Sequence, residues 1–475
     1  MPKLEFTFLE YYRQNTHLLR AGLLQRIDEL SVSDYPTTTP NQIICFLQDF
    51  LARLDEVIGK AGSEDKLKML NSLIRELGIF LEWLDNAHTE QTPRGLVQLL
   101  KDLIDQMTPD SRVIARPLAQ YNYTIFDLGQ LLKKLVDDFI PHSQQAGFQE
   151  YITSPIKLIS FPRIERDNML AHAIFGHELG HPIADEYLKK EGNDTAHKAT
   201  HAVIQKQVAE LVSQTLSGSN ADDAQKLALT TQVFNIILQV RKRALEELIS
   251  DVVGILIFGP SAFFACHAMF WNGNLDAKPR NDTWYPPPRM RLRLMLHLMD
   301  ELDIPMKFSQ IAGEQDISLY VAIVNEFLEE SRKLVDIKND QTAINSDPQL
   351  KIAYDWMNLS LENAIEYAKS SVSAVIFQSE MIFSQLPGLM RRLELGVPPN
   401  EVGDPQNPQT VDYRASLLVA WMFKLRGVNP DTGEVLSNDE VNRLYKKALT
   451  AIEYVILQNK YTSDLLQEPK AGDSA

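Results

Sequence analysis

The chain has 475 residues, more than one hydrophobic core usually serves, so we expect two or three domains or one large helical body. Hydrophobic residues make up 44% and charged residues 23%, which excludes a disordered or collagen-like protein. The formal net charge of −16 argues against a phosphate-neutralising surface, and we therefore expect no nucleic-acid partner.

Residues 1–105 are predicted to form an N-terminal helical region. Apolar residues recur at three- and four-residue steps in residues 44–58 and 67–84, as they do in packed amphipathic helices. The N-terminus lacks the charged-then-apolar layout of a signal peptide. Cys45 and Cys266 stand far apart in apolar surroundings, which is typical of buried free thiols in a reducing compartment. A cytoplasmic location is therefore expected.

Residues 106–300 are predicted to form the central region of the protein. Its first part contains short segments rich in β-branched and aromatic residues, which predict strands at residues 112–115, 121–125 and 156–161. A helix is expected at 127–140, between the second and third strands. We interpret 156–161 as a candidate edge strand that pairs with an extended substrate, with an ordinary short strand as the alternative.

The central motif is His177-Glu178-Leu179-Gly180-His181, which has the form H-E-x-x-H. Residues four apart lie on one face of a helix, so the two imidazoles can bind one metal ion while Glu178 reaches a metal-bound water. Zn²⁺ suits this arrangement because it lowers the pKa of such a water. We expect Asp167 or Asn168 to cap the helix and Pro182 to end or kink it.

A helical insertion is expected at about 190–240, with long helical patterns at 197–216 and 222–250. His197 and His201 are also four residues apart, but no acidic residue follows them as Glu178 follows His177. We interpret them as surface residues rather than as a second metal site.

A catalytic zinc ion held by two histidines needs a third protein ligand. The best candidate is Glu247, although the spacing also permits Glu246. Asp251 lies one helical turn after Glu247, where its carboxylate can accept a hydrogen bond from the second ring nitrogen of a liganding histidine.

Residues 252–271 are almost entirely apolar over the length that a bilayer requires. Gly259-Pro260 interrupts the stretch, and His267 lies within it. We therefore predict two buried core helices and no stable membrane insertion.

Residues 301–475 are predicted to form a C-terminal helical region. The clearest helical patterns are at 318–335, 350–373 and 441–458. Residues 396–412 are rich in proline and polar residues, which predicts a surface linker or a loop that lines a substrate groove.

H-E-x-x-H followed by E-x-x-x-D resembles the gluzincin clan of zinc metallopeptidases. The segment 282–291, DTWYPPPRMR, resembles the corresponding downstream segment of the CAAX prenyl protease and heat-shock metalloprotease family, and the resemblance covers roughly residues 156–295. It implies that Glu247 is the third zinc ligand and that Asp251 orients a histidine. That family is embedded in membranes, and Tyr285 stands where it has histidine.

The expected fold class is predominantly α with a small β-sheet, a zincin-like metallopeptidase core flanked by N- and C-terminal helical regions. We expect a Zn²⁺-dependent peptidase that acts on a protein or peptide substrate, with Glu178 as the general base. Tyr285 and Arg289 are candidate catalytic donors, with Arg291 as an alternative to Arg289, although the proline-rich segment is also typical of a rigid turn. A regulatory protein partner is conceivable. The alternative is a helical interaction or regulatory protein with a structural or inactive metal site.

Overall fold

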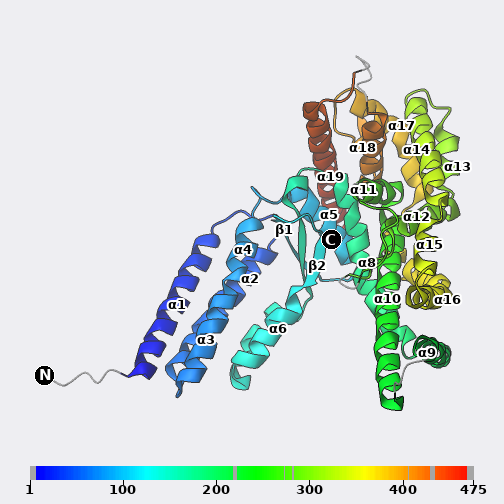
Figure 1. Ribbon diagram of the computed structural model, residues 1–475. Coiled ribbons are helices and arrows are strands. Elements are labelled where there is room, and N and C mark those ends of the chain that lie inside the picture. Colours follow the sequence, from blue (N-terminus) through cyan, green and yellow to red (C-terminus); the bar gives the residue numbers. More distant parts are fainter. Residues whose placement is uncertain are drawn as a thin grey trace, which may run out of the picture. The chain divides into compact units, whose positions relative to one another are not determined.

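The structure is a computed structural model that describes residues 7–217, 222–271, 273–280, 283–404, 406–427 and 434–467. Most of these residues are helical, and two small sheets complete the secondary structure (Figure 1). The predicted fold class, predominantly α with a small β-sheet, is confirmed by this secondary structure. The chain divides into two compact units, Met1–Asp167 and Asn168–Ala475. Their boundary lies inside residues 106–300, which were predicted to form one central region.

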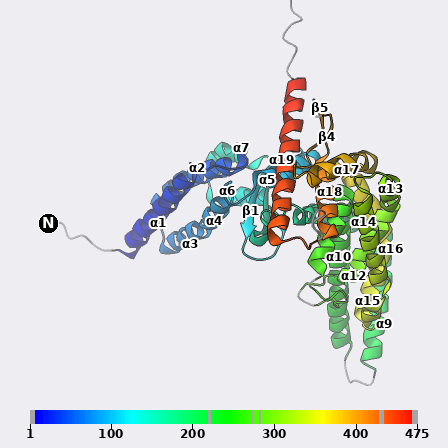
Figure 2. The same cartoon turned by 90° about the horizontal axis from the view of Figure 1, so that it is seen from above.

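The first unit is built mainly of helices. They are α1 (Phe8–Leu30), α2 (Thr39–Gly59), α3 (Glu64–Leu77), α4 (Ile79–Asn86), α5 (Arg94–Met107), α6 (Leu128–Phe139) and the short α7 (Gln149–Ile152). α1 packs against both α2 and α3 (Figure 2). The helical pattern at 67–84 corresponds to two helices, because α3 ends at Leu77 and α4 begins at Ile79. Gly78 between them caps α3, and its N–H donates to the carbonyl of Arg75.

A three-stranded sheet belongs to the same unit. It contains β1 (Arg112–Leu118), β2 (Thr124–Asp127) and β3 (Ile156–Pro162) in the order β1-β3-β2. β3 pairs in parallel with β1 and antiparallel with β2, so the prediction that 156–161 is an edge strand is wrong. The nearly continuous burial of β3 is typical of a central strand. The sheet joins the N-terminal unit because β1 packs on α2, α4 and α5.

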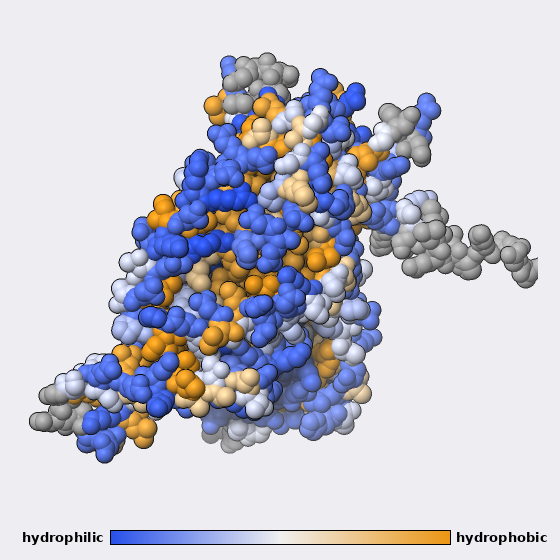
Figure 3. Space-filling model, turned by 90° about the vertical axis from the view of Figure 1, so that its right-hand side faces the viewer, coloured by the Kyte–Doolittle hydropathy of each residue, from blue (hydrophilic) through white to orange (hydrophobic). Residues whose placement is uncertain are grey.

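The second unit is organised around one long helix, α10 (Asp223–Phe258), which packs on α8 (Phe175–Glu191) and α16 (Pro348–Ser371). From Leu248 to Phe258 every residue of α10 is buried. The other helices are α9 (Thr195–Thr215), α11 (Pro260–Phe270), α12 (Pro288–Glu301), α13 (Ile304–Ile311), α14 (Ser318–Asp336), α15 (Asn339–Asn345), α17 (Ser379–Glu394), α18 (Tyr413–Arg426) and α19 (Asn438–Gln467). The face shown in Figure 3 carries hydrophobic patches interrupted by hydrophilic side chains.

Residues 396–412 do not form a simple linker. They contain a hairpin of β4 (Glu401–Asp404) and β5 (Asn407–Thr410), in which Gly403 pairs with Pro408. The segment lacks the alternation of apolar and polar residues that normally predicts strands, and its sequence alone therefore predicts a loop.

The apolar stretch 252–271 forms the end of α10 and all of α11, as predicted. Gly259 separates the two helices with a φ of +55°, and a Cβ at this position would lie 2.7 Å from the ring of Phe377. Only glycine accepts this combination of backbone angle and close packing. Within the described residues, no helix has both the length and the apolar character needed to cross a bilayer.

Candidate metal centre

The H-E-x-x-H motif lies in α8, near the start of the second unit. The chain enters this helix through a 3-10 turn, Ala171–Ile174, and the side chain of Asn168 accepts a hydrogen bond from the N–H of Ala171. Asn168 therefore accepts from the first residue of this turn, and α8 begins after Ile174 without a side-chain cap, so the predicted capping of α8 by Asp167 or Asn168 is wrong. The helix does not end at Pro182 but continues to Glu191.

Two glycines of α8 bring its backbone very close to α10. A Cβ on Gly176 would lie 2.9 Å from the Cα of Gly254, and a Cβ on Gly180 would lie 2.4 Å from the Cα of Ser250. Gly176 and Gly180 are four residues apart, so both lie on the helix face that carries the contact. This close approach lets short side chains from the two helices meet.

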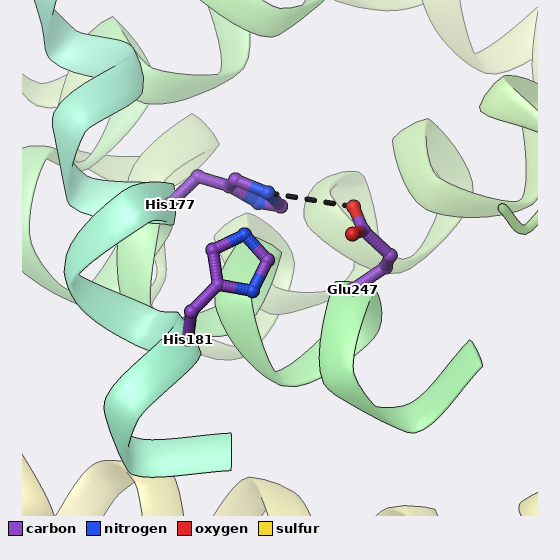
Figure 4. Close-up of side chains that lie close together, drawn as sticks. All are labelled: His177, His181 and Glu247. Atoms are coloured by element: carbon purple, nitrogen blue, oxygen red, sulfur yellow. Dashed lines mark ion pairs between the residues drawn. The ribbon is translucent and has the colours of Figure 1, made fainter. Parts of the chain in front are cut away.

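The histidines of α8 meet a carboxylate of α10. One possible ligand atom from each of His177, His181 and Glu247 lies within 4.8 Å of the other two (Figure 4). Nε2 of His177 is 3.4 Å from Oε2 of Glu247. The three side chains come from facing helices and point toward one another, so this group can hold a metal ion.

Asp251 lies behind His177 in the arrangement that the sequence predicts. Its Oδ1 is 2.8 Å from Nδ1 of His177, which leaves Nε2 directed at Glu247. Arg291 of α12 donates two hydrogen bonds of 2.7 Å to the same carboxylate, and its Nη1 lies 3.1 Å from Oε2 of Glu247. All of these groups are buried or nearly so, which fixes the imidazole ring in place.

The side of the site around His181 is more open. The side chain of His181 retains 25% of its exposure and that of Glu178 13%. Oε2 of Glu178 lies 3.8 Å from Nε2 of His181, so the glutamate of the motif borders the group that can hold the metal. This side is therefore where a water molecule or a substrate can approach.

The electrostatics of the site favour a cation. Burial lowers the pKa of His177, but its hydrogen bonds to Asp251 and Glu247 outweigh this effect and raise the pKa to about 9. Burial raises the pKa of Glu247, but Arg291 and His177 lower it to about 2. Burial also raises the pKa of Glu178 above its ordinary value.

The charge balance gives a further test of whether a metal ion fits. In the state that binds a metal, in which His177 has lost its proton and both histidines are neutral, the side chains of the site carry four negative and two positive charges, a net charge of −2, from Glu178, Glu246, Glu247, Asp251, Arg243 and Arg291. A buried net charge is costly unless it is compensated. A divalent cation bound to His177, His181 and Glu247 would neutralise it, so the residues present fit such an ion.

The other two predicted site residues lie in different surroundings. The hydroxyl of Tyr285 accepts a 2.8 Å hydrogen bond from Nη2 of Arg243, and Nη2 of Arg243 is also 2.9 Å from Oε1 of Glu247. Tyr285 is therefore connected to the candidate ligand Glu247 through the side chain of Arg243. Arg289 pairs with Asp276 and donates to the carbonyl of Leu334. Of the two candidate arginines, Arg289 and Arg291 of α12, Arg291 is the one that contacts Glu247 and Asp251. Asp282, the first residue of the proline-rich segment, lies outside the described residues.

His197 and His201 are not simple surface residues. His197 stacks on Trp356 with ring centroids 5.6 Å apart, and His201 makes edge contacts with Trp356 and Phe234. Both imidazoles are half-buried against these aromatic rings.

The two cysteines were predicted to be buried free thiols. Both are free, but only Cys266 is buried, because Cys45 is exposed.

Several residues of the site are absent from the sequence-based prediction. Arg243 and Ser250 have no motif of their own, since their roles depend on how α10 faces α8. Gly176 and Gly180 do carry a signal, because two glycines four residues apart inside a helix indicate close packing.

Comparisons of the chain with protein-family models, with curated proteins and with solved structures give no match.

Proposed function

We propose that this chain is a zinc-dependent peptidase of the gluzincin type. The observation that carries the proposal is the convergence of His177, His181 and Glu247 within 4.8 Å, with Glu178 beside them on the same helix. Two imidazoles and one carboxylate are a ligand set of catalytic zinc sites, which keep a further position open for water. A closed structural site normally uses four protein ligands, often cysteines, and has no need of Glu178.

Each residue has a distinct role in this proposal. Bound Zn²⁺ supplies Lewis acidity, which lowers the pKa of a water at the open position toward about 7. The carboxylate of Glu178 accepts a proton from the attacking water and then donates it to the leaving amine. Its raised pKa suits this role, because a group that both accepts and donates works best near the operating pH.

Tyr285 is the proposed electrophilic donor. Its hydroxyl oxygen accepts from Arg243, so its own proton remains available for the oxygen of a scissile carbonyl. Its 43% exposure is compatible with contact to a substrate. We propose no catalytic role for Arg289, whose guanidinium is held by Asp276.

The proposed substrate is a protein or a peptide in the cytoplasm. A regulatory partner, if the protein has one, would act at the more open side of the site near His181. The peptide class of substrate is supported by the motif order H-E-x-x-H and E-x-x-x-D. The same residues would also suit hydrolysis of other amide bonds, which makes the choice of assay important.

One observation favours a second candidate function. Glu247 is paired with both Arg243 and Arg291, which lowers its basicity as a ligand. A helical interaction or regulatory protein with a structural or inactive metal site would fit this pairing.

A peptide library separates the two functions. Cleavage products are identified by mass spectrometry for the purified protein, for the chelator-treated protein and for that protein after Zn²⁺ is restored. The proposed peptidase cleaves in the first and third samples only. Zinc binding without any cleavage, together with unfolding on chelation, would instead support the structural site.

A further inference from the structure

His181 contacts a different set of α10 residues from His177. Its Nδ1 lies 3.3 Å from Oγ of Ser250 and 3.3 Å from Oε1 of Glu246. Ser250 and Glu246 are four residues apart and therefore lie on one face of α10. This face meets α8 at Gly180, the residue before His181.

The direction of the hydrogen bonds determines which nitrogen of His181 carries a proton. The hydroxyl of Ser250 donates to the backbone carbonyl of Glu246 at 2.8 Å, so its oxygen is left to accept. Ionised Glu246 can only accept. Two acceptors at Nδ1 require that this nitrogen carries the hydrogen, and Nε2 then presents its lone pair on the side of Glu178.

Arg243 holds the carboxylate of Glu246 in this position. Its Nη1 is 2.9 Å from Oε1 of Glu246, while its Nη2 is 2.9 Å from Oε1 of Glu247. One guanidinium therefore spans two neighbouring carboxylates of the same helix. Because Glu246 is engaged by Arg243 and by Nδ1 of His181, it is not free to replace Glu247 as a ligand.

We propose that Glu246, supported by Ser250 and held by Arg243, is the positioning residue that directs Nε2 of His181 toward the metal. It does for the second histidine of the motif what Asp251 does for the first. α10 thus supplies one ligand, Glu247, and a separate orienting carboxylate for each histidine. This inference rests on the proposed metal site, but it does not require that the protein is a peptidase.

Two substitutions at one position test the proposal. Glu246→Ala and Glu246→Gln remove the same charge, but the side-chain oxygen of glutamine can still accept a hydrogen bond from Nδ1. The difference between them therefore isolates the hydrogen bond from the charge. Ser250→Ala removes the second acceptor and serves as an independent variant if Glu246→Ala fails to fold.

The measurements are the Zn²⁺ dissociation constant, by competition with a chelator, and the Nδ1–H resonance of His181, by ¹⁵N-resolved NMR of the zinc-loaded protein. We expect Glu246→Ala to bind Zn²⁺ about 10- to 100-fold more weakly and to lose the downfield Nδ1–H signal. Glu246→Gln should recover part of the affinity and keep the signal. Ser250→Ala should weaken binding less than Glu246→Ala.

Equal affinities for Glu246→Ala and Glu246→Gln, or wild-type affinity in both, would overturn the positioning role. A wild-type protein that binds no Zn²⁺ would overturn both this role and the proposed function. Tight zinc binding that depends on Glu246, combined with no peptide cleavage, would overturn only the proposed peptidase activity.

Discussion

Oδ1 of Asp251 lies 2.8 Å from Nδ1 of His177, and the same carboxylate receives two hydrogen bonds from Arg291. Asp251 thus links a candidate metal ligand to a buried arginine. Both roles depend on the negative charge of Asp251. Burial raises the pKa of its carboxyl, but Arg291 and His177 outweigh this effect and lower the pKa to about 2, so the group is ionised at neutral pH.

Asp251→Asn should weaken both metal binding and folding. The amide keeps the shape of the side chain but removes one of the two carboxylates that pair with the buried guanidinium of Arg291, the other being Glu247. Breaking a buried pair in this way costs about 3–5 kcal/mol, and loss of an orienting carboxylate costs about 10- to 100-fold in metal affinity. Urea unfolding and chelator competition measure the two effects.

The matched control for this variant is Asp355→Asn. Asp355 pairs with Lys351 on the surface of α16, where both side chains are more than half exposed. Its loss should change the free energy of unfolding by less than about 1 kcal/mol. Equal stability losses in the two variants would contradict the role assigned to the buried pair.

Gly180→Ala should disrupt the contact between α8 and α10. The added Cβ would lie 2.4 Å from the Cα of Ser250, so one backbone must move. We expect a loss of about 1–3 kcal/mol in unfolding free energy, together with weaker zinc binding. Thermal unfolding and chelator competition report the two losses.

Gly192→Ala provides the control for the glycine variant. Gly192 follows the same helix, and a Cβ there would meet its nearest atom at an ordinary 3.4 Å. It should therefore leave zinc affinity unchanged. If Gly180→Ala behaves like Gly192→Ala, the close approach of the two helices is not what assembles the site.

Zinc affinity should rise with pH in the neutral range. In the metal-free protein His177 has a pKa of about 9, so its imidazole is protonated at neutral pH. Nε2 must lose this proton before it can bind a metal, and affinity should increase about tenfold for each pH unit below that pKa. Calorimetry in buffers of different ionisation enthalpy counts the released protons. A flat profile with no proton release would be inconsistent with His177 as a ligand.

Glu178→Gln should slow cleavage by about 10²- to 10⁴-fold while the metal stays bound. Glutamine cannot accept the proton of the attacking water, and general-base catalysis typically contributes about 10²- to 10⁴-fold to a rate. Initial rates on a cleaved peptide and zinc content by mass spectrometry give the two readouts. Asp185→Asn, on the same helix but half exposed and paired with Lys189, should retain activity. Equal rates for Glu178→Gln and the wild type would remove Glu178 from the mechanism.

The local features of the site could be predicted from the sequence because they depend on spacing within single helices. The four-residue step from His177 to His181 places both on one face of α8, and the step from Glu247 to Asp251 does the same on α10. Both helices are present, and the structure brings His177, His181 and Glu247 together.

Features that depend on packing between elements could not be predicted in this way. Arg289 and Arg291 are two residues apart on α12, and only the way this helix packs on α10 determines that Arg291 reaches Asp251 while Arg289 pairs with Asp276. The position of β3 between two strands likewise depends on pairing partners, since its apolar run is compatible with an edge or a centre when read alone.

The most direct test of the metal centre is a crystal structure of the zinc-loaded protein with anomalous data collected at the zinc absorption edge. We expect one strong anomalous peak at about 2.0–2.2 Å from Nε2 of His177, Nε2 of His181 and a carboxylate oxygen of Glu247. The absence of a peak between these three residues, or a peak bound by other side chains, would contradict the account.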